Sequence, residues 1–248
     1  MTTSIAQRIL LAGRPTVLFH THQVTRAVLD QAIRAGKSMD LDICVDDAGQ
    51  LFLGHSPEYY RKSGEKPLPS MPLDDAIASL SVSPIPVVVD CKHGDAWPAI
   101  ERVIAILGPR RCLVHAFLKE LRYPFADMQD QCVESQWLDA ALMKALKARF
   151  PAVTTTASAS GLPNDFCQHN AKYHGLMDQI VGVLRNHDIE TVCLNTADEH
   201  CFTRGLVDFF SDNGILVHLN IDKFAGDLPG GAFIGESDSL DKADSFAV

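Results

Sequence analysis

The chain has 248 residues, of which 46% are hydrophobic, and a formal net charge of −9 at pH 7. This length suits one large α/β domain or two small ones, and the apolar content can form a substantial core, which excludes a disordered chain. The negative charge argues against a nucleic-acid-binding surface, which requires a basic patch, but a bound cation could still recruit an anionic substrate.

The N-terminal segment MTTSIAQRILLAGRP contains one short apolar patch that Arg8 and Arg14 interrupt. It makes a poor signal peptide and is far too short to span a membrane. The seven cysteines include no C-x-x-C pair, and several lie in apolar runs, where a free thiol behaves as a small hydrophobic side chain. We therefore expect reduced cysteines in a cytoplasmic protein without a transmembrane segment.

Short runs rich in β-branched residues alternate with stretches of helical periodicity along the chain. The predicted strands are Thr16–His20, Met39–Val45, Leu51–His55, Val87–Cys91, Arg111–Phe117, Ala152–Thr156, Thr191–Asn195, Ile215–Asn220 and Ala232–Gly235. The predicted helices are Val24–Ala35, Leu73–Leu80, Trp97–Leu107, Ser135–Arg149, His174–His187 and Thr203–Asp212. The polar tail from about residue 241 is expected to fray.

This alternation of strands and helices, without an internal linker, indicates a parallel sheet with helical crossovers. At this length the leading architecture is a (β/α)₈ TIM barrel, regular or irregular, that forms a single α/β domain over residues 1–248. A doubly wound open sheet is the alternative, but no G-x-G-x-x-G motif follows the first strand, which weakens it.

Charged residues occupy alternate positions of two predicted strands. Asp40 and Asp42 share one face of Met39–Val45, and Asp90 and Lys92 share a face at the end of Val87–Cys91. Barrel interiors are normally filled by Val, Ile and Leu, so inward charge is costly unless it is paired or bound to a metal. Three aspartates on neighbouring strands, with a lysine beside them, would make an oxygen-rich site for a hard divalent cation. The alternative is that they cap loops or helices, which is the usual role of a single Asp-x-Asp.

These residues resemble the glycerophosphodiester phosphodiesterase superfamily. The shared features are the acidic-x-Asp strand MDLDI (39–43), the segment DAGQLFLGH (47–55) with its turn and terminal histidine, the helix start MPLDDA (71–76), and the acidic-x-Lys strand VVVDCK (87–92). The intervals from His20 to Asp40 and from Asp40 to His55 are similar to those of the sphingomyelinase D/phospholipase D branch. The resemblance covers about residues 16 to 95.

The resemblance implies a Mg²⁺-dependent phosphodiesterase that acts on a glycerophosphodiester or a (lyso)phospholipid-type substrate. By this resemblance His20 and His55 are the catalytic acid–base pair, Asp40, Asp42 and Asp90 bind Mg²⁺ (or Ca²⁺, another hard cation), and Lys92 is a phosphate or carboxylate partner. The chemistry agrees, because phosphodiester cleavage needs charge neutralisation at the non-bridging oxygens and two proton transfers.

The chain also departs from the family. Asp40 replaces the usual glutamate, and the sequence around His218 and Asn220 replaces a tryptophan; these two residues share a face at the end of a late strand and are expected to line the pocket and bind substrate. The segment from His20 to Val24 lacks the arginine and the Glu-Asn pair of glycerophosphodiesterases proper. With less to orient an attacking water, we expect an internal substrate hydroxyl to attack and to produce a cyclic phosphate.

Two alternatives remain. His20-Thr21-His22 also resembles the metal-binding His-x-His of amidohydrolases and of the polymerase-and-histidinol-phosphatase type of phosphoesterase, although those need further histidines at later strand ends. His20 and His22 share strand parity, so only the interval to Asp40 favours His20 as the residue that faces the site. The second alternative is an inactive barrel that binds a ligand. The other histidines, at positions 93, 115, 169, 174, 187 and 200, show no shared spacing and are expected to be surface or core residues.

Overall fold

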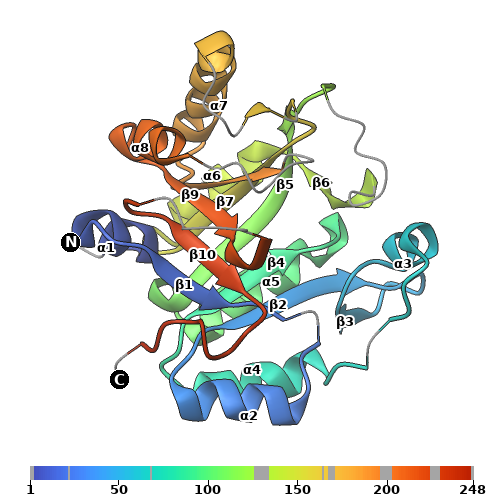
Figure 1. Cartoon of the computed structure of the whole chain (residues 1–248). Helices are drawn as coiled ribbons and strands as arrows, with labels where there is room; N and C mark the ends of the chain where they lie inside the picture. The colour runs from blue at the N-terminus through green and yellow to red at the C-terminus, as the bar shows by residue number, and fades with distance from the viewer. Residues whose placement is uncertain are drawn as a thin grey trace.

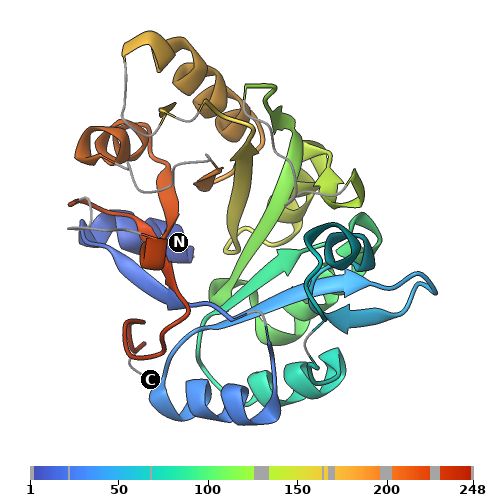
Figure 2. The ribbon, with the colours of Figure 1, turned by 45° about the vertical axis from the view of Figure 1, so that its right-hand side comes forward.

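The computed structural model describes residues 3–21, 23–67, 69–125, 134–163, 165–166, 171–195, 203–223 and 230–246. Eight parallel strands curve into an irregular (β/α)₈ barrel, as predicted (Figures 1 and 2). Around the barrel these strands are β1 (Thr16–Phe19), β2 (Met39–Val45), β4 (Val87–Cys91), β5 (Cys112–Arg122), β7 (Thr154–Ser160), β8 (Thr191–Asn195), β9 (Leu216–Asn220) and β10 (Ile234–Ser237).

The barrel has one seam. Parallel ladders join β2 through β4, β5, β7, β8 and β9 to β10, and β10 to β1. No ladder joins β1 to β2 in the described part of the chain, where the backbone N–H of Phe19 instead donates to the Ser38 hydroxyl at 2.7 Å. The barrel is therefore held at this seam by side chains.

Six helices connect or follow the barrel strands near the predicted positions. They are α2 (Arg26–Ala35), α4 (Leu73–Ser81), α5 (Trp97–Leu107), α6 (Ala140–Arg149), α7 (His174–Asn186) and α8 (Arg204–Asp212). The predicted helix Ser135–Arg149 is too long, because Trp137 and Leu138 pair with β5 as the short strand β6 (Trp137–Leu138). α6 begins after Asp139, whose side chain accepts a hydrogen bond from the Ala141 N–H.

Among the described residues the fold also contains a further strand and two further α-helices. β3 (Leu51–Leu53) pairs antiparallel with β2, and α3 (Pro57–Ser63), which the sequence analysis did not predict, follows it. α1 (Ile5–Ala12), also not predicted, begins with a capping box formed by Ser4 and Gln7.

α1 covers the N-terminal end of the barrel. Its buried residues Ile5, Ala6 and Ile9 belong to one apolar cluster with inward-facing residues of the barrel strands. These strand residues are Leu18, Val88, Leu113, Leu216 and Ile234. The Thr154 hydroxyl accepts a hydrogen bond from the Ala6 N–H. The apolar N-terminal patch is thus a plug for the barrel, and no described helix of the chain is long and apolar enough to cross a membrane.

The C-terminal tail is held against β1 and α2, in contrast to the expected fraying. The Asp244 carboxylate accepts a hydrogen bond from the Val17 N–H at 2.8 Å, and the Phe246 N–H donates to the carbonyl of Gly36. Ala243 is buried. Through Phe246 the tail is therefore part of the folded domain.

Candidate active site

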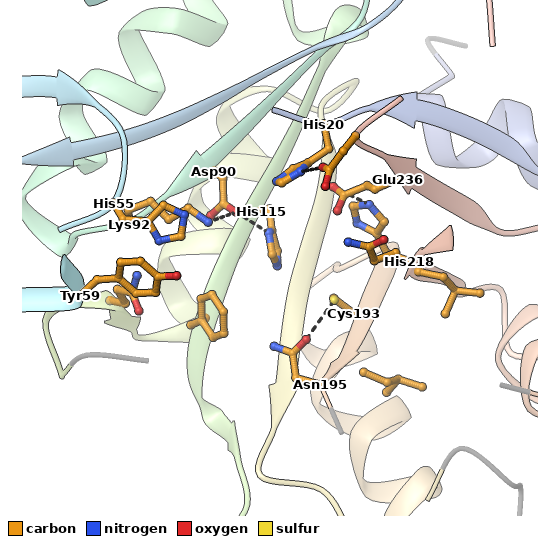
Figure 3. A pocket seen from close by; sticks show the side chains of 16 residues that line it. His20, His55, Tyr59, Asp90, Lys92, His115, Cys193, Asn195, His218 and Glu236 are labelled. Carbon is orange, nitrogen blue, oxygen red and sulfur yellow. Dashed lines mark hydrogen bonds and ion pairs between the residues drawn. The ribbon is translucent and has the colours of Figure 1, made fainter. Parts of the chain in front are cut away.

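The parallel register brings polar side chains together at the C-terminal ends of the strands. Residues paired across a parallel ladder point to the same face, and the ladders align Asp42 with Asp90, Asp90 with His115, and Cys193 with His218. The inward face surrounds a cavity of ≈ 330 Å³ (Figure 3). It is lined by His20, His55, Tyr59, Asp90, Lys92, His115, Phe117, Gln136, Cys193, Leu194, Asn195, His218, Leu219, Asn220, Glu236 and Asp238.

Most of the predicted site residues meet at this cavity. The lining includes six of them, His20, His55, Asp90, Lys92, His218 and Asn220. Asp40 and Asp42 are 1% and 2% exposed and lie behind the lining, in contact with His20, His55 and Lys92. His22 lies outside the described residues, so its role as an alternative to His20 stays a prediction.

Lys92 neutralises two of the three aspartates. Its ammonium lies 2.7 Å from Asp90 Oδ2 and 3.2 Å from Asp42 Oδ1, and its side chain is 9% exposed. Burial lowers the pKa of Lys92, but the charges of Asp42 and Asp90 outweigh burial and raise it well above its ordinary value. Lys92 is therefore a permanent cation at the floor of the cavity.

His20 is held from both sides. Its Nδ1 lies 2.7 Å from Asp238 Oδ1, and its Nε2 lies 3.3 Å from Asp40 Oδ2. Burial lowers the pKa of His20, but the hydrogen bond with Asp238 and the charge of Asp40 outweigh this and raise it to about 10. Burial and the charge of Asp42 together raise the pKa of Asp40 well above its usual range.

His55 is positioned by the turn between β3 and α3. Gly54 has a φ of 141°, and a Cβ built on it would lie 3.2 Å from the Tyr60 hydroxyl, so this turn needs glycine. The Tyr60 hydroxyl also accepts a hydrogen bond from the His55 N–H, and the Tyr59 ring lies 4.2 Å from the imidazole centroid. His55 Nε2 is thereby placed 3.2 Å from Asp42 Oδ2.

The sequence analysis missed three acidic or imidazole groups that line the cavity, namely His115, Glu236 and Asp238. His115, expected to be an ordinary surface or core residue, lines the cavity, with Nδ1 2.8 Å from Asp90 Oδ2 and Nε2 2.7 Å from Ser158 Oγ. Glu236 lies one residue beyond the predicted end of the last strand and approaches His218 Nε2 to 2.8 Å. The signal for His115 was available, since it shares the inward face of its strand with Leu113 and Phe117.

The aspartates as arranged do not form a ready metal site. Among the described residues, no group of three His, Cys, Asp or Glu side chains is placed to hold a metal ion. Asp40 Oδ1 and Asp90 Oδ1 are buried without a hydrogen-bond partner, but the other oxygens of these residues contact His20, Lys92 and His115. We therefore derive no chemical step through a metal, and Mg²⁺ or Ca²⁺ binding stays a prediction from the sequence.

Comparison with known proteins gives a likeness of fold. A glycerophosphodiester phosphodiesterase from Parabacteroides distasonis superimposes with a TM-score of 0.51 and 11% identity, over 91% of this chain and 93% of that chain. A 2,3-dimethylmalate lyase of the PEP mutase/isocitrate lyase superfamily (TM-score 0.49, 12% identity, 96% and 80% covered) and the YdjI aldolase from Escherichia coli K12 (0.47, 11%, 95% and 81%) are also similar.

The superposition on the phosphodiesterase structure supports the barrel fold. At 11% identity the phosphodiesterase structure shares the fold with this chain, and the fold alone does not determine the reaction. No protein-family model matches the chain, and no curated protein matches it. The function must therefore be argued from the side chains of the cavity.

Proposed function

We propose that the chain is a phosphodiesterase that cleaves a glycerophosphodiester or a (lyso)phospholipid-type diester. The observation that carries the proposal is that His20, His55 and Lys92 line one cavity, each held by an aspartate behind it. Cleavage of a phosphodiester requires two proton transfers and neutralisation of the charge on the non-bridging oxygens. Two imidazoles and a fixed cation can supply these.

The surroundings of each group suggest its part in the reaction. Lys92 and the protonated His20 would attract the phosphate and balance the charge of its non-bridging oxygens. His55, at the opposite end of the buried aspartates, would exchange a proton with a reacting oxygen. Asp40 and Asp42 would hold the two rings in register, as carboxylates behind catalytic histidines commonly do.

The argument for a cyclic product loses its basis. It rested on the absence of a carboxylate and an arginine near the first histidine in sequence, but the structure places Asp238 against His20 and Glu236 in the same cavity lining. Glu236 lies on β10 and Asp238 in the loop after it, and β10 is adjacent to β1 in space and remote in sequence. The membership of the sphingomyelinase D branch rests on residue spacing alone and stays a prediction.

The amidohydrolase-type alternative gains histidines but no metal site. His115 and His218 do lie at later strand ends, as that alternative needs. His218 is occupied by Glu236, and His115 by Asp90 and Ser158. The rival needs these histidines as metal ligands, whereas the phosphodiesterase proposal uses the side chains as they are paired here, so we prefer the phosphodiesterase.

The test is turnover of glycerophosphocholine and lysophosphatidylcholine, followed by ³¹P NMR, with Mg²⁺, with Ca²⁺ and with chelator. We expect His20→Asn and His55→Asn each to lower kcat/KM by about 10²–10⁴-fold. His187→Asn, at the end of α7 and outside the cavity, is the matched control and should leave turnover unchanged. Wild-type protein that cleaves neither diester under any of these conditions would contradict the proposal and favour a binding protein.

A further inference from the structure

Glu236 is a cavity-lining carboxylate to which the proposed reaction assigns no role. It faces the barrel interior from β10, where an unneeded charge is costly. Figure 3 shows Glu236 and His218 on the side of the cavity across from His55 and Lys92. This placement follows from the strand order, since β9 and β10 lie on the other side of the barrel from β4.

The contacts of Glu236 leave part of the carboxylate facing the cavity. Its Oε1 lies 2.8 Å from His218 Nε2, and its side chain is 19% exposed. Beyond this pair, no hydrogen bond or ion pair joins Glu236 side-chain oxygens to another described residue. Burial raises the pKa of Glu236, but the charges of His218 and His20 outweigh burial and lower it, so the group is ionised.

His218 supports Glu236 from behind. The His218 side chain is 2% exposed, and both of its ring nitrogens are shielded from solvent. His218 Nε2 is directed at Glu236 Oε1, and the carboxylate, at 19% exposure, is the more accessible member of the pair. His218 is thus a positioning residue, and the more exposed Glu236 is the member of the pair that meets the cavity contents.

We propose that Glu236 binds and orients the water molecule that attacks the phosphorus, and that His218 fixes the carboxylate for this task. The inference rests on the proposed phosphodiesterase function and names the group that completes it. Orientation matters more than basicity here, because phosphoryl transfer depends mainly on positioning and charge stabilisation.

The step balances as a hydrolysis. The water oxygen forms a bond to phosphorus while one water proton passes to Glu236, and the bond from phosphorus to the leaving alcohol oxygen breaks. The leaving oxygen takes a proton from His55, while His20 stays protonated beside the non-bridging oxygens. The products are a phosphomonoester and an alcohol, and solvent returns the proton from Glu236 to the histidine.

This route predicts which substrates are accepted. A water held by the protein can attack any diester that fits the cavity, whereas ring closure requires a hydroxyl next to the phosphate. We therefore expect cleavage of both glycerophosphocholine, which has such a hydroxyl, and bis(4-nitrophenyl) phosphate, which has none.

The first experiment follows both reactions in H₂¹⁸O by ³¹P NMR and mass spectrometry under single-turnover conditions. The expected product is a linear phosphomonoester with one ¹⁸O from the first time point, and no cyclic phosphate. A cyclic phosphate that precedes the linear product, or cleavage confined to glycerophosphocholine, would overturn the inference.

The second experiment compares Glu236→Gln with Glu190→Gln. Glu190 is a matched control because it also forms a 2.8 Å ion pair, with Lys147, at 14% exposure but away from the cavity. We expect Glu236→Gln to lower kcat about 10²-fold with KM within about threefold, and His218→Asn to lower kcat about tenfold. Melting temperatures near that of the wild type show that the variants are folded, and Glu190→Gln should keep the wild-type kcat.

The two proposals fail in different ways. Wild-type turnover with an unchanged kcat in Glu236→Gln removes Glu236 from the reaction but leaves the phosphodiesterase intact. A Glu236→Gln variant that loses affinity and keeps kcat would make Glu236 a binding group and would also overturn the inference. Absence of any wild-type turnover removes the proposed function and this inference together.

Discussion

At the scale of single residues, the charge balance of the candidate site depends on Lys92. It bridges Asp42 and Asp90 within 3.2 Å of each, and all three side chains are less than 10% exposed. Two carboxylates this close and this buried would repel one another strongly without the ammonium between them. The lysine thus supplies one positive charge beside the carboxylates, and binding of a divalent cation by them stays a prediction.

Replacing Lys92 by methionine should therefore destabilise the fold by about 3–5 kcal/mol, because a buried carboxylate pair loses its counterion. Mg²⁺ or Ca²⁺ should raise the melting temperature of Lys92→Met more than that of the wild type, since the vacated position is negative. Urea unfolding and thermal melts with and without each ion measure both effects. Lys119→Met, at an exposed position of β5, should change neither.

The pKa of His20 gives a pH dependence with a definite sign. Its folded-state pKa of about 10 lies above the ordinary histidine pKa of 6.5, so the contribution of its contacts is fully present below pH 6.5. That contribution falls as the pH rises toward 10, where the folded protein also loses the proton. The stability difference between wild type and His20→Asn in urea should shrink from pH 6 to pH 10, and a difference that grows over this range would contradict the assignment.

Strand parity explains which site residues were predictable. Asp40, Asp42, Asp90 and Lys92 alternate with apolar residues, so the sequence alone places them on one face. Glu236 was not predicted, because the predicted strand Ala232–Gly235 ends two residues before the observed end of β10 at Ser237.

Asp238 and His115 were missed for a different reason. Asp238 is in the loop after β10, where periodicity carries no information, and its partner His20 is 218 positions away in sequence. His115 is a single histidine in an apolar strand, a context in which a core residue is the more common outcome.

At the scale of elements, α1 contributes to the stability of the barrel and lies away from the candidate active site. Its side chains fill the N-terminal end of the barrel, and the cavity is at the opposite end of the strands. This arrangement places the site on the C-terminal ends of the strands and gives the plug a structural role at the other end.

Ile5→Ala, in α1, should cost about 2–5 kcal/mol of stability, because Ile5 is 3% exposed and its removal leaves a cavity among apolar neighbours. At a temperature where the variant is folded, kcat should equal that of the wild type. Chemical unfolding and steady-state kinetics on the same preparation test this. Leu11→Ala, at a position 81% exposed on the same helix, is the control and should change neither quantity.

The errors in element prediction have local causes. α1 was overlooked because its apolar patch is short and interrupted by Arg8, although Ser4 and Gln7 make a recognisable capping box. α3 has no buried residue, so it lacks the apolar periodicity on which helix prediction relies. Trp137 and Leu138 were predicted to be helical, but their backbone pairs with β5 and they form the strand β6 instead.

At the scale of the whole molecule, the rhythm of strands and helices was enough to predict the barrel. Each right-handed crossover places the next strand beside the last, so the strand order follows from the sequence order. The closing of the barrel was not predictable in the same way, because the pairing of β1 with β10 joins the two ends of the chain. The seam between β1 and β2 depends on side-chain contacts that no sequence pattern specifies.

The seam between β1 and β2 is a place where the barrel can open and close. β1, with the catalytic candidate His20 just past its end, is linked to β2 by the His20–Asp40 contact and by the Phe19–Ser38 hydrogen bond. An anion that touches both His20 and Lys92 would link β1 to the other side of the seam, because Lys92 follows β4, the neighbour of β2, and part of its binding free energy would go into closing the barrel. Hydrogen–deuterium exchange of segments 16–20 and 38–42 should then slow when inorganic phosphate is added, while α7 (His174–Asn186), which contributes no residue to the cavity lining, should stay unchanged. Equal exchange with and without phosphate would mean that the barrel is already closed before any ligand arrives.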